Sequence, residues 1–324
     1  MFVSAAADGT LRGRCLLTVP DLSSTEIGTI LALASSLKHS RAADQLPLLR
    51  GKSAVMLFEK PSLRTRVSFE VAMTQLGGHA LFAQGSEFML GTRETPEDAA
   101  RVLSRYVDAI VIRTHAHEPL ERFAAAATVP VINALSAVAH PCQALADMLT
   151  IKERFGTLSG LRIAYVGDGR NNVAASLAHS ALMSGISVTF ACPPSHRPSE
   201  TFMAAAAKLG KPRGATMRAF SNPLRAVREA DVVYTDVWTS MGEEHLAERN
   251  AAALLPYRVD AAMMSAAAKH AVFMHCLPAH REEEVAAEVI DGPQSVVFDQ
   301  AENRLHAQKG LLVALLTDLR GMPE

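Results

Sequence analysis

Strand-like and helix-like segments alternate along nearly the whole chain, and this pattern limits the folds that it can adopt. Short apolar runs such as 53–58 (SAVMLF) and 109–113 (AIVIR) have the length of buried strands, and longer amphipathic stretches lie between such runs. The alternation predicts right-handed βαβ crossovers, and therefore an α/β fold with parallel sheets covered by helices on both faces. The predicted strands are 53–58, 109–113, 129–133, 162–166, 187–191, 232–236, 272–275 and 296–298.

The length of 324 residues favours two domains of about 150 residues each. We expect an N-terminal extension over 1–14, a first domain over 15–150 and a second domain over 151–302. A last helix, starting at about residue 303 in the C-terminal segment 303–324, has enough apolar surface to pack back on the first domain. The expected architecture is two parallel-sheet α/β domains with the active site in the cleft between them.

Composition and charge exclude several classes of protein. The chain is 49% hydrophobic and 20% charged, which rules out a disordered chain, a collagen and a small disulfide scaffold. The net charge of −1 gives no overall attraction to nucleic acid or to an anionic membrane. No apolar run reaches the roughly 18 residues that a transmembrane helix needs. We therefore expect neither a nucleic-acid partner nor a membrane partner.

The four cysteines lie too far apart in sequence for a C-x-x-C motif, which argues against a zinc ribbon and a thioredoxin-like redox site. Unpaired cysteines suit a reducing compartment, and the N-terminal segment lacks the charged and apolar regions of a secretory signal. Cytoplasmic residence is therefore predicted, with a short organellar presequence as the alternative. We expect no metal and no cofactor. The cysteines are Cys15, Cys142, Cys192 and Cys276.

The segment 58–70 (FEKPSLRTRVSFE) is the most informative stretch for chemistry. It places a strand end and a proline turn before Ser62, Arg64 and Thr65 at the start of a helix. Free backbone N–H groups and the positive helix end meet there, so a phosphate would bind well, and an arginine can grip it with two hydrogen bonds. The alternative is an ordinary capped helix with solvated arginines. The segment is not a P-loop, because it lacks that motif's glycines and lysine.

Other strand ends supply complementary polar groups. Arg113 leaves a buried strand at its carboxyl end, where α/β sheets bind ligands. His140 and Gln143 open a helix on one face, as a ligand-binding pair or as a helix cap. Cys276 follows a histidine at another strand end and is either a nucleophile or a structural thiol. The loop 167–172 (GDGRNN) lacks the glycine spacing of a dinucleotide site, which argues against NAD.

Seven segments, taken in order, resemble the aspartate/ornithine carbamoyltransferase family over about residues 15–320. FEKPSLRTRVSFE resembles the carbamoyl phosphate loop of that family. DVWTSMG (236–242) and HCLP (275–278) resemble the strings that separate its ornithine enzymes from its aspartate enzymes. The other segments are VLSRYVDAIVIRT, HPCQALAD, GDGRNN and AENRLHAQK.

The resemblance implies carbamoyl transfer from carbamoyl phosphate to the side-chain amine of L-ornithine, giving L-citrulline and phosphate. It also implies direct attack by the amine and a homotrimer or a multiple of trimers. The catalytic residues that it implies are Cys276, Asp236, Arg113 and His140. The residues implied for carbamoyl phosphate are Ser62, Leu63, Arg64, Thr65, Arg113, His140, Gln143, Cys276, Leu277 and Arg304. Those implied for ornithine are Asn172, Asp236, Ser240 and Met241.

The chain departs from the family pattern at two positions. Leu63 stands where many members have threonine, and Met89 stands where ornithine enzymes often present a polar side chain to the neighbouring subunit. The backbone N–H of Leu63 can still serve the loop, whereas Met89 puts the contact between subunits in doubt. Other interpretations are transfer to putrescine, agmatine or an N-acylated ornithine, and a non-catalytic protein that binds a phosphorylated metabolite.

Overall fold

The computed structural model describes residues 11–40, 46–84, 90–92, 94–239 and 244–319, and the chain forms two compact units. The first unit comprises Met1–Leu149 and Glu302–Glu324, and the second comprises Thr150–Ala301. Within the described residues, no helix has both the length and the apolar character needed to cross a membrane.

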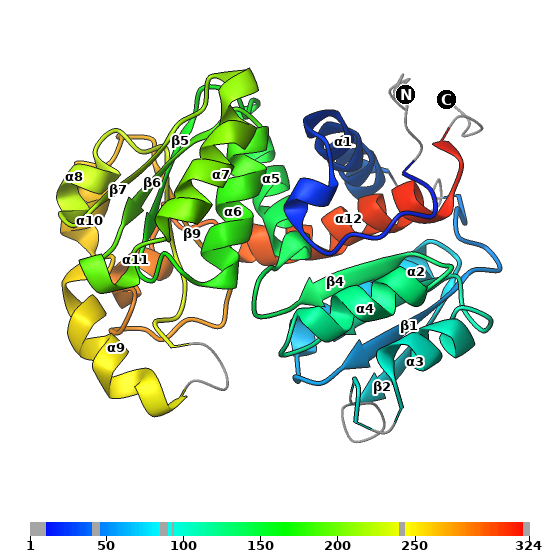
Figure 1. The fold of residues 1–324 in the computed structure, drawn as a ribbon. Coiled ribbons are helices and arrows are strands. Elements are labelled where there is room, and N and C mark those ends of the chain that lie inside the picture. Colours follow the sequence, from blue (N-terminus) through cyan, green and yellow to red (C-terminus); the bar gives the residue numbers. More distant parts are fainter. Residues whose placement is uncertain (1–10, 41–45, 85–89, 93, 240–243, 320–324) are drawn as a thin grey trace. The chain divides into compact units, whose positions relative to one another are not determined.

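The first unit is built on a parallel sheet with the strand order β2-β1-β3-β4 (Figure 1). Phe58 pairs with Arg113 in the register of β1 and β3, so the carboxyl ends of these strands are level. The strands are β1 (Ser53–Phe58), β2 (His79–Gln84), β3 (Ala109–Arg113) and β4 (Val131–Leu135).

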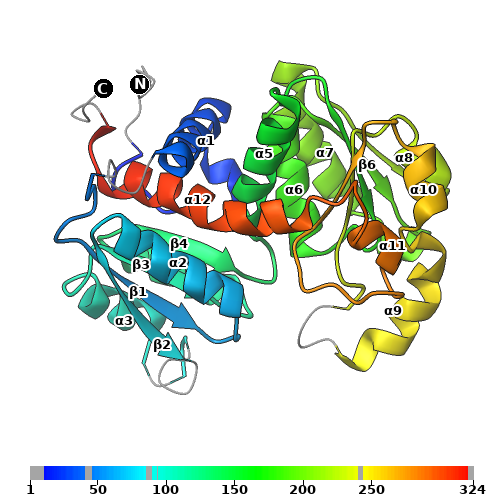
Figure 2. The ribbon, with the colours of Figure 1, turned by 180° about the vertical axis from the view of Figure 1, so that it is seen from behind.

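Helices cover both faces of this sheet because successive residues of each strand point alternately into two apolar layers, one on each face. Figures 1 and 2 show α3 and α4 on one face and α2 on the other. The first layer joins Val55 and Ile110 of the strands to Ala100 and Phe123 of the helices. The helices are α1 (Ser24–His39), α2 (Leu63–Gln75), α3 (Pro96–Leu103) and α4 (Glu118–Ala126), with α5 (Pro141–Phe155) up to Leu149 and α12 (Val297–Leu316) from Glu302.

The last helix, α12, packs closely against α1. A Cβ atom at Gly310 would lie 2.6 Å from the backbone oxygen of Ile30, so only glycine allows this approach. The predicted start of this helix at residue 303 is wrong, and so is the predicted strand at 296–298. Ser295 forms only an isolated bridge with Phe273, and the helix begins at Val297. A run of three apolar residues is too short for its periodicity to separate a strand from a first helical turn.

The second unit contains a parallel sheet with the strand order β7-β6-β5-β8-β9. Its strands are β5 (Arg162–Val166), β6 (Ser187–Ala191), β7 (Met217–Phe220), β8 (Val232–Thr235) and β9 (Val272–His275). Its helices are α6 (Asn172–Met183), α7 (Glu200–Gly210), α8 (Pro223–Val227), α9 (Ala247–Leu254), α10 (Ala261–Ala266) and α11 (Ala287–Ile290). One core cluster joins β5, β8 and β9 to α8, α9, α10 and α11.

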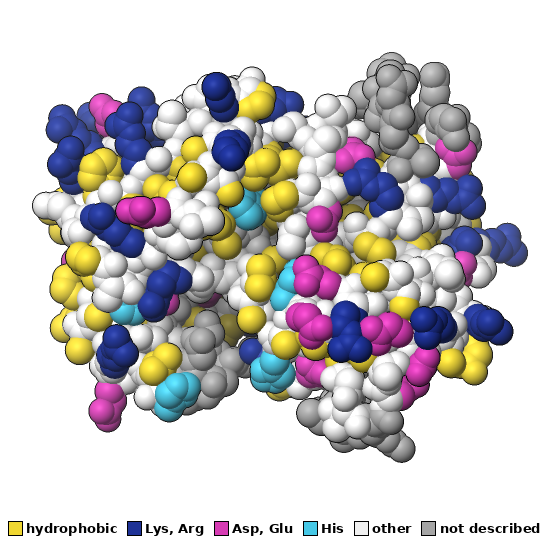
Figure 3. Space-filling model, viewed as in Figure 1, with side chains coloured by type: hydrophobic (Ala, Val, Ile, Leu, Met, Phe, Trp, Pro, Cys, Tyr) yellow, Lys and Arg dark blue, Asp and Glu magenta, His cyan; other side chains and the backbone are white. Residues whose placement is uncertain are grey.

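Charged side chains of both signs are mixed on the surface over α4 (Figure 3). Arg122 of this helix donates hydrogen bonds to both carboxylate oxygens of Glu97, at 2.8 and 3.0 Å, and also faces Glu118. This pairing agrees with the near-zero net charge of the chain, −1.

Candidate active site

The helix α2 begins as the sequence predicts, with Ser62 as its cap. The Ser62 hydroxyl accepts a hydrogen bond from the Thr65 backbone N–H and donates one to Thr65 Oγ1 at 2.9 Å. Thr65 is buried, whereas Leu63 and Arg64 in the same turn are exposed. The turn therefore offers backbone N–H groups, a positive helix end and a guanidinium to one anion.

Three of the predicted binding residues meet beside this turn, although they come from α2, α5 and α12. Arg304 donates hydrogen bonds to Gln143 Oε1 at 2.8 Å and to Thr65 Oγ1 at 3.3 Å. The amide nitrogen of Gln143 in turn donates to Asp147 at 2.8 Å. Because all four side chains are buried, the guanidinium of Arg304 is held in a fixed orientation.

Arg113 and His140 add two further buried polar groups to the first unit. Arg113 ends β3, and its carbonyl oxygen accepts a hydrogen bond from the Glu59 backbone N–H at 2.8 Å. His140 lies immediately before α5. Burial, and then the positive charges of Arg304 and Arg113, hold the pKa of His140 well below its usual range. A neutral imidazole can donate a hydrogen bond to an anion or a carbonyl without adding charge.

The lowered pKa of His140 predicts that its ring does not titrate between pH 6 and 8. The folded protein keeps this ring neutral, so its contribution to stability is present above the ordinary histidine pKa of about 6.5 and is lost as the pH falls below it. Histidine ring signals measured by NMR should include one that stays constant over this range and disappears in His140→Asn. A His140 signal that titrates near pH 6.5 would contradict this prediction.

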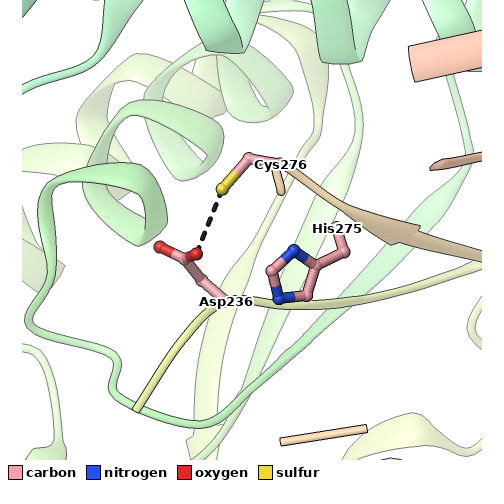
Figure 4. A group of neighbouring side chains, drawn as sticks. All are labelled: Asp236, His275 and Cys276. Atoms are coloured by element: carbon pink, nitrogen blue, oxygen red, sulfur yellow. Dashed lines mark hydrogen bonds between the residues drawn. The ribbon is translucent and has the colours of Figure 1, made fainter. Parts of the chain in front are cut away.

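In the second unit, Asp236 and Cys276 follow the ends of the paired strands β8 and β9, where Thr235 lies opposite His275. The Cys276 thiol donates a hydrogen bond to Asp236 Oδ1 at 3.1 Å, as Figure 4 shows. The same oxygen accepts the Val237 backbone N–H at 2.9 Å. The pair thus presents a carboxylate and a thiol together, which is suitable for binding and orienting an amine.

Asn171, which the sequence did not single out, also contacts Asp236. Its side-chain N–H₂ group donates to Asp236 Oδ2 at 3.3 Å and to the Tyr165 hydroxyl at 2.8 Å. Its oxygen caps α6 by accepting the Ala174 N–H at 2.7 Å. The neighbouring Asn172 is the first residue of that helix. The cap position of Asn171, before an alanine-rich helix, was the signal that could have separated the two asparagines.

The hydroxyl of Tyr165 stays protonated beside this group. Burial, and then the negative charge of Asp236, raise the pKa of Tyr165 well above its usual value. The hydroxyl therefore contributes polarity without negative charge next to Asp236.

Leu277 has an unusual backbone conformation directly after Cys276. Its φ angle is +56°, in the left-handed region that a bulky residue rarely adopts. Its backbone N–H donates to His275 Nδ1 at 2.9 Å, which closes a tight turn around Cys276. The predicted residues Ser240, Met241 and Met89 lie outside the described residues.

Among the residues that the structure describes, two groups of side chains have metal-ligand atoms within 4.8 Å of one another, namely Asp236, His275 and Cys276, and His280, Glu283 and Glu284. In the first group both ring nitrogens of His275 already face partners, Leu277 N–H and Glu284. A metal there would have to displace one of them. The expectation that the chain binds no metal stays a prediction.

Sequence models of one family match both halves of the chain. The model described as "Aspartate/ornithine carbamoyltransferase, carbamoyl-P binding domain" matches residues 14–153, and that described as "Aspartate/ornithine carbamoyltransferase, Asp/Orn binding domain" matches 159–315. The chain belongs to the aspartate/ornithine carbamoyltransferase family. The predicted α/β fold with two parallel sheets and the predicted carbamoyltransferase class are thereby confirmed.

Individual members of the family are similar over almost the full chain. The ornithine carbamoyltransferase of Hyperthermus butylicus is 52% identical over 310 residues, which is 95% of this chain and 99% of that protein. That of Bacillus subtilis is 50% identical over 307 residues, 95% of each chain. The solved structure of ornithine carbamoyltransferase from Pyrococcus furiosus has a TM-score of 0.92 at 48% identity and covers 97% of this chain and 100% of that one.

Proposed function

We propose that this carbamoyltransferase transfers the carbamoyl group of carbamoyl phosphate to the side-chain amine of L-ornithine, giving L-citrulline and phosphate. The observation that carries the proposal is the Cys276 thiol held on the Asp236 carboxylate at the ends of β8 and β9. These residues belong to the strings DVWTSMG and HCLP, which resemble those of ornithine enzymes. The relatives named ornithine carbamoyltransferase support the same acceptor.

Carbamoyl phosphate is assigned to the first unit. The first turn of α2, with Ser62, Leu63, Arg64 and Thr65, binds the phosphate group. Arg304 and Gln143, which are hydrogen-bonded to each other at 2.8 Å, bind the same ligand. Arg113 and neutral His140 stabilise charge on the carbonyl oxygen and on the leaving phosphate. Fixed dipoles and charges of this kind lower a barrier by several kcal/mol, because they need no reorganisation during the reaction.

The amine of ornithine is assigned to the second unit, where Asp236, Asn172, Ser240 and Met241 bind the amino acid. An amine with a lysine-like pKa of about 10.4 is protonated at neutral pH and must lose that proton before it can attack. The Asp236 carboxylate and the Cys276 thiol orient it and favour this loss.

The reaction that we assign is a direct attack. The nitrogen lone pair forms the new C–N bond, the C–O bond to phosphate breaks, and its electron pair leaves with the phosphate. The ammonium proton is lost to Asp236 before the attack, and the second proton leaves the nitrogen after the attack and passes to the phosphate or to solvent. No covalent bond to the enzyme is needed, because the nucleophile is the substrate's own amine.

A homotrimer of this chain in the cytoplasm, serving arginine biosynthesis, completes the proposal. Three apolar side chains on α2 and the neighbouring edge strand β2 support an assembly, because an exposed apolar edge requires cover. They are Leu63, Val67 and Leu81, with exposed fractions of 77%, 45% and 48%. The four cysteines are free thiols, as a reducing compartment would keep them.

A steady-state assay across amine acceptors tests the proposed function. We expect kcat/KM for L-ornithine to exceed that for putrescine, agmatine or N-acetylornithine by at least about 10²-fold, since a site that pairs polar groups with a substrate rejects analogues that lack them. Formation of the carbamoylated product is followed by chromatography. A preference for putrescine or N-acetylornithine would overturn the assignment.

A further inference from the structure

The side-chain amide of Asn250 connects two segments of the second unit that lie far apart in sequence. Asn250 lies in α9, and its side chain is buried. Its NH₂ group donates hydrogen bonds to the Trp238 carbonyl oxygen at 3.0 Å and to Thr239 Oγ1 at 3.3 Å. Its Oδ1 lies 3.3 Å from His196 Nε2. Both donors and the oxygen of this amide are thus paired, as burial of an amide requires.

These contacts set the orientation of the amide and the place of a proton on His196. The Trp238 carbonyl oxygen can only accept a hydrogen bond, so the NH₂ group of Asn250 faces it and Oδ1 faces the histidine. Since an amide oxygen also only accepts, His196 Nε2 carries a proton and donates. The other ring nitrogen, Nδ1, lies 3.0 Å from Ser195 Oγ. The buried imidazole is therefore held at both of its nitrogens.

His196 connects this network to the loop that precedes α6. Its carbonyl oxygen accepts the Gly169 N–H at 3.0 Å. A Cβ atom at Gly169 would lie 3.1 Å from the same oxygen, closer than ordinary van der Waals contact, so glycine permits this approach. The loop ends at Asn171, whose amide donates to Asp236 Oδ2. On this side the network therefore leads to a hydrogen-bond partner of Asp236.

On its other side the network holds the main chain directly after Asp236. Trp238, two residues further on, belongs to the core cluster that includes Leu254 of α9. No described residue forms a hydrogen bond with its indole N–H, so packing holds the ring while the Asn250 amide holds the carbonyl oxygen. Asn250 thus lies where the two segments that support the Asp236 carboxylate meet.

We propose that Asn250 is a positioning residue for the carbamoyl transfer: together with His196, it holds the two segments that place the Asp236 carboxylate for the acceptor amine. This inference rests on the proposed function, in which Asp236 orients the ornithine amine. Asn250 touches neither substrate in this scheme. Its effect is confined to the acceptor side of the reaction, because carbamoyl phosphate is assigned to the first unit.

Asn250→Leu tests the role, because leucine has a similar volume and removes both donors and the acceptor. We expect kcat/KM for ornithine to fall by about 10- to 100-fold, since a small misplacement of a positioned group has an effect of this size, while KM for carbamoyl phosphate changes less than twofold. His196→Gln retains an N–H donor near the place of Nε2 and should keep at least a third of the activity. Arg249→Ala changes the adjacent, exposed residue of α9 and should leave the kinetics unchanged.

The fluorescence of Trp238 provides a readout that does not depend on the reaction, because this residue is the only tryptophan of the chain. Quenching by acrylamide is measured on the protein without substrates. The quenching constant should be at least about twofold larger in Asn250→Leu than in the wild type, and unchanged in Arg249→Ala. A lower unfolding temperature in Asn250→Leu with quenching and kinetics at wild-type values would indicate a role in stability alone and would overturn the proposal.

A double-mutant cycle with Asp236→Asn separates positioning of the carboxylate from other effects on the second unit. When the carboxylate is absent, Asn250→Leu should lower kcat by less than about twofold. A full second loss in that background, or an equal loss for both substrates, would contradict the positioning role. If Asn250→Leu does not fold, as judged by circular dichroism, His196→Leu is measured against the same outcomes. Failure of the wild type to carbamoylate ornithine would refute the proposed function, whereas unchanged quenching of Trp238 would refute the role of Asn250 even in an active enzyme.

Discussion

Replacement of Arg64 by alanine is expected to lower kcat/KM for carbamoyl phosphate by about 10³-fold. Arg64 lies in the first turn of α2, exposed beside backbone N–H groups that the Ser62 cap leaves available. Its planar guanidinium can form two charge-assisted hydrogen bonds with a phosphate, at the helix end where negative charge is most favourable. Loss of one fixed donor to a developing anion lowers kcat by about 10²- to 10³-fold in well-studied enzymes. We expect the loss of a full positive charge to have an effect at the upper end of this range.

The measurement is steady-state kinetics with carbamoyl phosphate varied, together with calorimetric titration of its binding. Arg122→Ala is the matched control, because Arg122 is an exposed arginine of the same unit that pairs with Glu97 on the outer face of α4. It should retain activity within about twofold. Near-normal turnover in Arg64→Ala would show that the first turn of α2 does not bind the phosphate.

Most of the fold could be predicted because most of its strands are short, largely buried apolar runs. The strands at 53–58, 109–113, 162–166, 187–191 and 272–275 were predicted with the bounds that the structure has. The edge strands β2 and β7 were missed, because their side chains are partly exposed and give no clear apolar run. The strand predicted at 129–133 lies two residues later, at Val131–Leu135.

The candidate site could be predicted where polar residues end buried strands or open helices. This pattern located Arg113, His140 and the Asp236–Cys276 pair, since topology brings the carboxyl ends of parallel strands to one edge. It could not reveal Asn250, because an asparagine in the charged string AERN looks like a surface residue. Its burial depends on the long-range contact with His196, which sequence spacing does not encode.

Replacement of Asp236 by asparagine is expected to lower kcat for ornithine by at least about 10²-fold, with carbamoyl phosphate binding unchanged. Asparagine Oδ1 can still accept hydrogen bonds from Val237 N–H and the Cys276 thiol, whereas its NH₂ group loses the hydrogen bond from Asn171. It lacks the negative charge that orients a cationic amine and the carboxylate oxygen that can accept its proton. Proton transfer of this kind contributes about 10²- to 10⁴-fold in enzymes.

Cys276→Ser is the companion variant for Asp236→Asn, since a hydroxyl can replace the thiol as a donor to Asp236 at a cost below that of losing the carboxylate. Norvaline has the carbon chain and the α-amino acid group of ornithine but lacks the side-chain amine. Calorimetric titration with norvaline therefore measures binding of the amino acid part separately from binding of the side-chain amine. Both variants should bind norvaline nearly as the wild type does, because the defect concerns the amine. Equal weakening of norvaline and carbamoyl phosphate binding would instead indicate that Asp236 supports the fold of the second unit and takes no part in handling the amine.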